Sequence, residues 1–277
     1  MDPITTQGMR MPKLGLGTGQ LRNAAGQAAI ELAISLGYRH FDTAEMYTNE
    51  ATVGAAIAAS GLPRGEVHLT TKVMQDNLAP DALRRSMDRS LAALKMDYVD
   101  LYLIHWPMPD MDMAATLGEM MRLKEAGRAR AIGVSNFNVA LLRKAVEEIG
   151  APIAANQVEY HALLDQSALL RYGRAHGVAL IAYAPLGRGR VLEPPEMQTI
   201  AHKHGVSPAQ VALKWLLDQD LVSAIPRAGR RESQQQNLDA LRLVLDDEDR
   251  AAIAALPKDQ RVVNVAWAPP WDPPETA

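Results

Sequence analysis

The sequence contains no cysteine and few aromatic residues. Among its 277 residues there is no Cys, and Phe, Trp and Tyr together make up 5%. The lack of thiols excludes disulfides, thiolate metal sites and cysteine nucleophiles, and it agrees with a reducing compartment such as the cytoplasm. The first residues show no secretory signal, and no apolar run approaches the roughly 20 residues of a membrane span. We therefore predict a cytoplasmic protein that has no membrane partner.

A strong net charge is also missing. Lys and Arg number 29 and Asp and Glu 32, which leaves a formal net charge of −3. This balance gives no reason to expect nucleic acid as a partner. With 48% hydrophobic residues, the chain can bury a sizeable core. No linker, low-complexity segment or shift in composition interrupts it, so we predict one domain over residues 1–277.

Short β-rich runs alternate with helical patterns along the chain. Each run is rich in Val, Ile and Leu and is followed by helix signals, which is the pattern of successive βα units. The predicted strands are Lys13–Gly17, Arg39–Thr43, Val67–Lys72, Val99–Trp106, Ala131–Asn136, Ala154–Tyr160, Ala179–Pro185 and Leu221–Pro226.

Start and stop signals mark the helices between these runs. Asn23 is expected to cap a helix that ends at Gly37, and Asn138 to cap a helix over Val139–Ile149. Further helices are predicted over Pro80–Leu94, from the Ser207 capping box through Trp215, and from Asp246 to Pro257.

Strands that alternate with helices indicate a mostly parallel sheet covered by helices. We favour closure of this sheet into a (β/α)8 TIM barrel; left open, it would be a doubly wound sheet. The segment from about residue 258 to residue 277 is rich in Pro and Trp. It is predicted to form a loop over the barrel rim.

Polar or ionisable residues stand at the end of nearly every predicted strand. In a barrel of this kind the carboxyl ends of the strands form one rim, where the reacting groups lie. Each residue alone could be a surface lysine, a helix cap or a buried structural histidine, so the prediction of a site depends on their coincidence at one rim. They are Asp42, Lys72, His105, Ser135, Asn136, Gln157, Tyr183 and Arg227.

Tyr47 lies shortly after Asp42 and joins Lys72 and His105 in a set suited to proton transfer. A phenol has a pKa of about 10, too high for an efficient acid at neutral pH. A neighbouring ammonium lowers that pKa by favouring the phenolate, and a carboxylate holds the ammonium in place. A histidine can hydrogen-bond a substrate oxygen and orient it. The set predicts proton delivery to a carbonyl oxygen.

The motifs around these residues resemble those of the aldo-keto reductase family. They occur in the family's order over nearly the whole chain, and the ordered set is far more specific than any one motif. The end of the chain is most similar to the bacterial 2,5-diketo-D-gluconate reductases. The motifs are Gly15-Leu16-Gly17-Thr18, Asp42–Glu50, Thr71-Lys72, Asp100–Pro107, Ile132–Phe137, Asn156-Gln157 and Tyr183–Gly187.

The resemblance implies an NADPH-dependent reductase of small aldehydes, keto-sugars or keto-acids. It makes Tyr47 the general acid and Lys72 its pKa partner. It pairs Asp42 with Lys72 and gives His105 the orienting role. A monomer is expected, and no metal is needed.

The resemblance also implies a nicotinamide site at the rim. Ser135, Asn136 and Gln157 would hold the carboxamide, and Tyr183 would stack on the nicotinamide ring. The remaining cofactor contacts implied there are Thr18, Leu186 and Gly187, the last two at the pyrophosphate.

The phosphate-binding end departs from the family pattern. The family usually has a Lys-Ser pair and a more distal arginine after the last strand, but this chain has Arg227-Ala228 and Ser233. Arg230 and Arg231 are expected to supply the missing charge, because arginine forks suit a 2′-phosphate. The alternative is a solvated basic loop, so we predict NADPH and keep NADH as possible. The cofactor positions at this end are Arg227, Arg230, Arg231, Gln236 (a glutamate in the family) and Asn237.

The predicted substrate pocket also differs from the family's. Gly19 stands where an aromatic residue is often found and Met74 where a tryptophan is common, whereas Trp106 is retained. These residues predict a wider, less aromatic pocket. Trp267 and Trp271 are expected either to cover it from the tail or to pack on the barrel rim.

Two other functions are compatible with the fold. A sensor or subunit that binds the cofactor with little turnover would not need the proton donor, so the intact set at Tyr47 argues against it. A metal-dependent hydrolase would need several His or carboxylate ligands on strand ends, and only His105 and Asp42 qualify.

Overall fold

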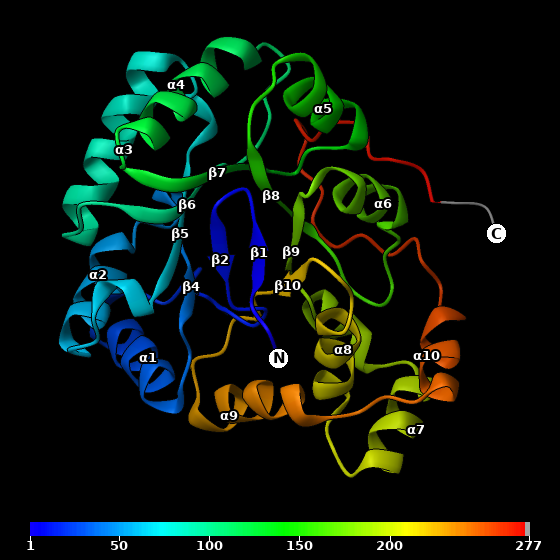
Figure 1. The fold of residues 1–277 in the computed structure, drawn as a ribbon. Helices are drawn as coiled ribbons and strands as arrows, with labels where there is room; N and C mark the ends of the chain where they lie inside the picture. The colour runs from blue at the N-terminus through cyan, green and yellow to red at the C-terminus, as the bar shows by residue number, and fades with distance from the viewer. Residues whose placement is uncertain (275–277) are drawn as a thin grey trace.

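The computed structural model describes residues 1–274 and places a parallel sheet inside a ring of helices (Figure 1). The sheet has eight strands in the order β10-β9-β8-β7-β6-β5-β4-β3, and all neighbouring strands are parallel. Parallel neighbours need crossover connections, which the helices supply. The strands are β3 (Leu16–Gly17), β4 (His40–Asp42), β5 (His68–Val73), β6 (Val99–Ile104), β7 (Ala129–Ser135), β8 (Ile153–Glu159), β9 (Ala179–Tyr183) and β10 (Val222–Ala224).

The two edge strands of this sheet meet, so the sheet closes into a barrel. Leu14, just before β3, forms a parallel bridge with Ala224 of β10. The Gly15 amide donates to the Ala224 carbonyl oxygen at 2.9 Å. A Cβ atom at Gly17 would lie 2.7 Å from the Ile225 carbonyl oxygen, so the close approach at this seam requires glycine. The predicted (β/α)8 barrel is confirmed, and all eight predicted strands are present with somewhat different ends.

Helices cover the outside of the barrel, and several of their predicted ends are confirmed. The side chains of Asn138, Ser207 and Asp246 cap the helices that follow them. Gly37 ends α1 with a φ of 111°, a left-handed conformation that glycine adopts easily. The α-helices are α1 (Asn23–Leu36), α2 (Glu50–Ala59), α3 (Pro80–Leu94), α4 (Met113–Glu125), α5 (Val139–Arg143), α6 (Ser167–His176), α7 (Pro195–His204), α8 (Pro208–Leu217), α9 (Arg231–Asp239) and α10 (Asp247–Ala254).

Two helix predictions were wrong in detail. Asn23 does not cap α1: its φ is 58°, Arg22 takes the capping position, and no side-chain hydrogen bond closes the helix start. Capping residues normally have extended backbone, which Asn23 lacks. The segment predicted as one helix over Val139–Ile149 is α-helical only to Arg143 and continues as a π-helix over Lys144–Glu148. A pattern of apolar residues does not distinguish these two helix types over one turn.

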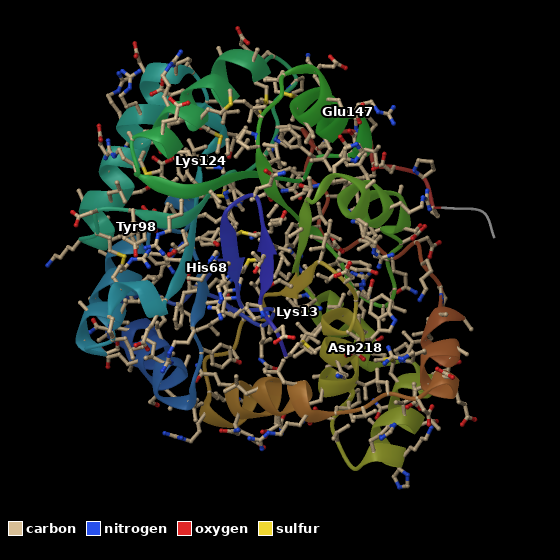
Figure 2. All side chains as sticks on the ribbon, viewed as in Figure 1. Lys13, His68, Tyr98, Lys124, Glu147 and Asp218 are labelled. Atoms are coloured by element: carbon tan, nitrogen blue, oxygen red, sulfur yellow. The ribbon has the colours of Figure 1, made fainter. Side chains whose placement is uncertain are left out.

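An unpredicted hairpin covers the N-terminal end of the barrel. Its antiparallel strands are β1 (Ile4–Thr6) and β2 (Met9–Met11), drawn in blue across the middle of Figure 1. Met11 is fully buried and packs with Leu101 and Ile181 inside the barrel. His68 of β5 lies beside the hairpin (Figure 2), and its Nδ1 is 3.2 Å from the Arg10 carbonyl oxygen. Strands of three residues are too short to show a period in the sequence.

The chain after α10 crosses the outside of the barrel without forming a helix. We call residues 258–274 the C-terminal strap; the last three residues of the predicted loop lie outside the described chain. The Gln260 amide donates to the Leu163 carbonyl oxygen at 2.9 Å, so the strap begins against the segment after β8. No helix of the described chain is long and apolar enough to cross a membrane.

Candidate active site

The C-terminal strand ends bring the predicted proton-transfer set together. Asp42 ends β4, Lys72 lies near the end of β5, and His105 follows β6 directly. Tyr47 is the last residue of a 3-10 turn, η1 (Glu45–Tyr47), that follows β4. Neighbouring parallel strands place their carboxyl ends at one edge of the sheet, so these side chains converge there.

A buried ion pair forms the base of this set. The Lys72 ammonium donates to Asp42 Oδ1 at 2.6 Å and to the Thr43 carbonyl oxygen at 2.7 Å, and both side chains are almost fully buried. Gln157 donates from Nε2 to the other Asp42 oxygen at 2.6 Å. Burial alone would lower the pKa of Lys72, but the charge of Asp42 and hydrogen bonding raise it above its ordinary value. Lys72 therefore stays charged beside the phenol.

Tyr47 lies between this ion pair and His105. The Lys72 Nζ atom is 5.0 Å from the centre of the Tyr47 ring, and the His105 ring meets the Tyr47 ring edge-on at 5.6 Å. Burial raises the pKa of the Tyr47 phenol, Lys72 lowers it, and Asp42 raises it. The pKa of Tyr47 lies above its ordinary value, which corrects the lowered pKa expected from the sequence: burial outweighs the charge of Lys72 in this structure. The phenol therefore holds its proton at neutral pH.

His105 is neutral in this environment. Burial and the nearby charge of Lys72 lower the pKa of His105 to about 3. Its Nδ1 atom is buried and has no hydrogen-bond partner within the described chain. A neutral imidazole can hydrogen-bond a substrate oxygen without competing as an acid with the phenol.

The turn that carries Tyr47 is fixed by residues that the sequence did not identify as functional. The Glu45 carboxylate accepts hydrogen bonds from the Met74 amide at 3.0 Å and from Ser86 Oγ at 2.6 Å. The buried Asn49 side chain donates to the Thr18 carbonyl oxygen at 2.8 Å. Both residues lie within the Asp42–Glu50 motif, and this motif was the signal in the sequence that could have identified them.

The four residues predicted for the nicotinamide also lie together at this rim. Ser135 Oγ donates to the Gln157 carbonyl oxygen at 2.7 Å. The Asn136 amide donates to Ser135 Oγ at 3.1 Å and to the His105 carbonyl oxygen at 3.0 Å. The Tyr183 hydroxyl donates to Asn136 Oδ1 at 2.8 Å. These bonds form one network between the ends of β7, β8 and β9 and the His105 backbone.

The loop after β9 has left-handed backbone and carries positive charge. Gly187, Arg188 and Gly189 have φ values of 54°, 54° and 102°, all in the left-handed region. The Gly187 and Gly189 amides donate to backbone carbonyl oxygens of the same loop, both at 2.8 Å, so these two amides close its turns. Arg188 and Arg190 are exposed on the loop and add positive charge. The pyrophosphate contact of Leu186 and Gly187 stays a prediction.

The residues predicted for the adenosine end divide into exposed and buried groups. Arg227, Arg230 and Arg231 are exposed at the start of α9, and Arg227 is hydrogen-bonded to Gln20. Asn237 is buried and forms a side-chain hydrogen bond with Tyr38. The described chain thus leaves the three arginines accessible to a phosphate group.

Two further predicted cofactor residues differ in exposure. Gln236 is half-buried on α9. Thr18 is fully buried, and its hydroxyl donates to the Asp42 carbonyl oxygen at 2.9 Å. The Thr18 hydroxyl is thus bonded to the backbone beneath the site. This supports a structural role for Thr18 better than it supports contact with a ligand.

The predicted substrate residues do not all lie at the same place. A Cβ atom at Gly19 would lie 3.8 Å from the Tyr47 ring, so this glycine leaves space beside the phenol. Met74 follows β5 and is half-buried, and Trp106 is buried next to His105. Trp267, in contrast, is 40% exposed and lines an apolar groove of about 330 Å³ outside the proton-transfer set.

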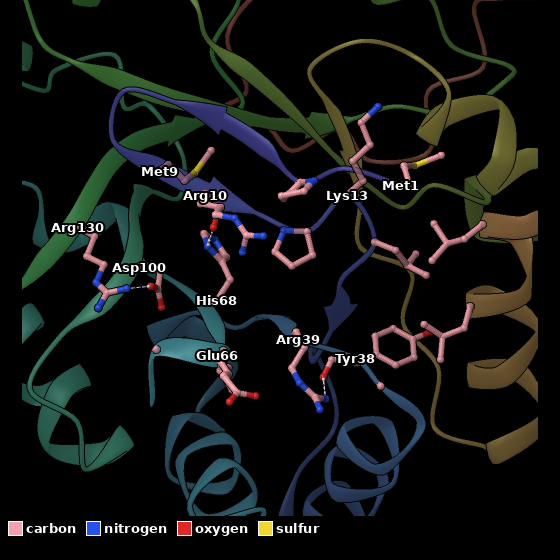
Figure 3. Close-up of a pocket in the computed structure, with 18 of the residues that line it drawn as sticks. Met1, Met9, Arg10, Lys13, Tyr38, Arg39, Glu66, His68, Asp100 and Arg130 are labelled. Atoms are coloured by element: carbon pink, nitrogen blue, oxygen red, sulfur yellow. Dashed lines mark hydrogen bonds and ion pairs between the residues drawn. The ribbon is translucent and has the colours of Figure 1, made fainter. Parts of the chain in front are cut away.

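A second hollow lies at the opposite end of the barrel. This cavity of about 580 Å³ is lined by Arg10, Arg39, Glu66 and His68 (Figure 3). The His40 and His68 rings meet edge-on at 4.8 Å, and burial lowers the pKa of His40 to about 4. No residue of the proton-transfer set lines this cavity. Within residues 1–274, no group of three or more His, Cys, Asp or Glu side chains is placed to hold a metal ion.

Comparisons with known proteins agree along almost the whole chain. A family model described as the aldo/keto reductase family matches residues 13–258. Methylglyoxal reductase DkgB of Escherichia coli O157:H7 is 41% identical over 268 residues, which cover 95% of this chain and 100% of the relative. An aldo-keto reductase of Mycobacterium avium (strain 104) is 41% identical over 256 residues, 92% of this chain and 89% of the relative.

Solved structures show the same similarity. A crystal structure of a protein assigned as 2,5-diketo-D-gluconic acid reductase B matches with a TM-score of 0.94 at 40% identity, covering 99% of this chain and 98% of that one. The aldose reductase of Schistosoma japonicum matches with a TM-score of 0.91 at 29% identity, covering 97% and 96%.

Proposed function

Since this chain belongs to the aldo/keto reductase family and is an oxidoreductase that acts on carbonyl groups, we propose that it reduces small aldehydes, keto-sugars or keto-acids with NADPH. The observation that carries the proposal is the buried Lys72–Asp42 pair beside Tyr47 and the neutral His105. The similarity to bacterial 2,5-diketo-D-gluconate reductases that the motifs predict is confirmed by the relatives.

The chain's own residues would bind, orient and protonate the substrate. His105 hydrogen-bonds the carbonyl oxygen and turns it toward Tyr47, whose hydroxyl donates the proton as negative charge develops on that oxygen. Lys72 stabilises the phenolate that remains, and Asp42 keeps the ammonium in place. NADPH, when bound, supplies the hydride for the carbonyl carbon.

The nicotinamide and its phosphates would be held by groups already placed at the rim. Ser135, Asn136 and Gln157 are proposed to hold the carboxamide, with Tyr183 against the nicotinamide ring. Leu186 and Gly187 are proposed to lie at the pyrophosphate, where the exposed Arg188 and Arg190 of the same loop add positive charge. The exposed Arg227, Arg230 and Arg231 support a preference for NADPH, because arginine forks bind a 2′-phosphate that NADH lacks.

The substrates are proposed to be small dicarbonyl or keto compounds. Relatives are named methylglyoxal reductase and 2,5-diketo-D-gluconic acid reductase B. Gly19 leaves space beside Tyr47, and Met74 stands where a tryptophan is common in the family, which supports a wider pocket. A monomer is proposed.

The experiment is a panel of carbonyl compounds assayed with NADPH and with NADH. We expect decay of dihydronicotinamide absorbance with methylglyoxal and 2,5-diketo-D-gluconate, faster with NADPH. Quenching of tryptophan fluorescence by NADPH without any turnover would contradict the proposal and favour a cofactor-binding sensor.

A further inference from the structure

A fully buried carboxylate at the end of β8 has no part in the proton-transfer set. Glu159 is 0% exposed. It accepts hydrogen bonds from the backbone amides of Val262 and Val263, at 2.6 and 2.7 Å. A carboxylate is costly to bury unless such donors replace its water. The C-terminal strap supplies these donors, so Glu159 fixes the strap to the barrel.

From this anchor the strap reaches the substrate side of the site. The Arg261 guanidinium lies 3.8 Å from the centre of the Trp271 ring and 3.9 Å from Glu159. Trp271 approaches the Trp106 ring at 6.3 Å in an edge-on arrangement. Trp106 directly follows His105 in the chain, so we infer that the position of Trp271 affects the space beside the catalytic groups.

The far end of the strap has a second anchor. Asp272 accepts a hydrogen bond from the Val139 amide at 3.0 Å. The Asn138 side chain donates to the Pro270 carbonyl oxygen at 2.8 Å. These contacts hold the strap at the start of α5, and Arg261 interacts with the carboxylates of both anchors.

Through His161, Glu159 is also linked to the proposed pyrophosphate loop. His161 Nε2 lies 3.0 Å from the Glu159 carboxylate. A Cβ atom at Gly187 would lie 3.4 Å from the same His161 nitrogen. The loop therefore passes close to His161, and His161 contacts Glu159. One carboxylate thus touches both the strap and the support of the loop.

We propose that Glu159 is a positioning residue that couples the cofactor loop to the strap. The inference rests on the proposed function, because it takes the Gly187 turn as the pyrophosphate site. A phosphate group bound there holds His161 in place, His161 holds Glu159, and Glu159 holds Val262 and Val263. Substrates that reach Trp271 depend on this chain of contacts, whereas small substrates that stop at His105 do not.

Glu159→Gln tests the coupling, because it keeps the size of the side chain and removes its charge. At saturating NADPH, we expect kcat/KM for a bulky aldehyde such as 2-naphthaldehyde to fall about tenfold, the effect of one charge-assisted hydrogen bond. The kcat for methylglyoxal should stay within about threefold of wild type. Affinity for NADPH, measured by tryptophan fluorescence, should also fall.

Two variants serve as matched controls. Asp272→Asn loosens the far anchor, so it should lower kcat/KM for 2-naphthaldehyde and leave NADPH affinity unchanged. Glu147→Gln removes a carboxylate whose side chain is 42% exposed, and it should change neither kcat/KM for 2-naphthaldehyde nor the affinity for NADPH. Hydrogen exchange supplies a readout without turnover: NADPH should protect the amides of residues 261–272 in wild type, and Glu159→Gln should abolish this protection.

The coupling is contradicted if Glu159→Gln lowers kcat/KM for 2-naphthaldehyde and for methylglyoxal by the same factor. It is also contradicted if NADPH still protects the strap amides from hydrogen exchange in that variant. Should Glu159→Gln fail to fold, Asp272→Asn tests the strap instead. An unchanged kcat/KM for 2-naphthaldehyde in Asp272→Asn would overturn the role of the strap. Absence of turnover in wild type with every carbonyl would instead contradict the proposed function, and strap protection by NADPH would still decide the coupling.

Discussion

Strands β4 and β5 carry a charged pair at one end of the barrel and a pair of neutral histidines at the other. His40 and Asp42 lie on one face of β4, and His68 and Lys72 lie on one face of β5. At the C-terminal rim, Lys72 and Asp42 form a charged pair 2.6 Å apart beside a phenol. At the N-terminal end, the two histidines pack edge-on at 4.8 Å beneath the hairpin, and burial lowers both of their pKa values.

The difference indicates that the C-terminal rim carries the chemistry and that the N-terminal end stabilises the fold. A buried charge is retained at the rim, where the Lys72 ammonium acts on the Tyr47 phenol. At the other end the buried histidines are neutral and contact backbone carbonyl oxygens of Pro12 and Arg10. The comparison predicts that changes at the rim alter turnover, whereas changes at the N-terminal end alter stability alone.

Lys72→Met should have the largest effect, because it removes the charge beside Tyr47 and leaves Asp42 unpaired. An uncompensated member of a buried ion pair costs about 3–5 kcal/mol of stability. Since Lys72 lowers the pKa of Tyr47, its loss should also move the alkaline limb of the weak residual rate to higher pH. Urea unfolding and a pH–rate profile check both effects, and an unshifted profile would mean that Lys72 does not act on the phenol.

Tyr47→Phe should alter turnover alone. The variant loses only a hydroxyl, so turnover should fall about a hundredfold or more, the usual contribution of a positioned acid. Affinity for NADPH and the free energy of unfolding should stay close to wild type. Steady-state kinetics and fluorescence titration measure these quantities. Retention of more than about a tenth of the activity is incompatible with the general-acid role.

Replacing Arg227, Arg230 and Arg231 together by alanine should weaken NADPH binding and spare NADH. Each charge-assisted hydrogen bond to a phosphate contributes about 1.5–3 kcal/mol, so the loss should reach roughly a hundredfold. NADH has no 2′-phosphate, and its affinity should move little. Fluorescence titration with each cofactor measures the two affinities. An equal loss of affinity for NADPH and NADH would mean that these arginines lie in a solvated loop and do not bind the 2′-phosphate.

Met11→Ala should leave turnover per folded molecule unchanged and lower stability. Met11 is fully buried in the hairpin that closes the N-terminal end, and truncation of such a side chain costs about 2–5 kcal/mol. Met74→Ala at the rim is the matched control, with a smaller effect on unfolding and a larger one on KM. The comparison of the two ends fails if Met11→Ala reduces kcat in the folded fraction.

Acid should destabilise the protein gradually through its buried histidines. The folded-state pKa of His40 is about 4 and that of His105 about 3, both below the ordinary value of 6.5. As the pH falls below 6.5, these histidines bind protons in the unfolded chain but not in the folded chain. Stability is therefore lost toward pH 4. Each histidine contributes up to about 1.4 kcal/mol per pH unit. His40→Gln should reduce this slope in urea unfolding at several pH values; an identical slope would refute the assignment.

The sequence was most informative where function depends on local pattern. Alternating strands and helices predicted the barrel, and polar residues at strand ends predicted Asp42, Lys72 and His105 as neighbours. Asn is common both at helix caps and in left-handed backbone, so its residue type did not reveal that Asn23 has a φ of 58° and does not cap α1. The short hairpin strands also escaped detection.

Long-range contacts could not be predicted from local pattern. Glu159 meets Val262 and Val263 only because the strap returns to β8, and no spacing in the sequence signals this return. The paired histidines at the N-terminal end have the same cause, because strand register alone brings His40 against His68.

Transfer of deuterium from NADPH labelled at the reactive C4 position to methylglyoxal tests the central claim most directly. In wild type, nuclear magnetic resonance should find one deuterium on the reduced carbonyl carbon, formed together with NADP⁺. With Tyr47→Phe, the same label should appear about a hundredfold or more slowly while NADPH still binds. Product without deuterium, or equal rates in the two proteins, would contradict hydride transfer to a carbonyl that Tyr47 protonates.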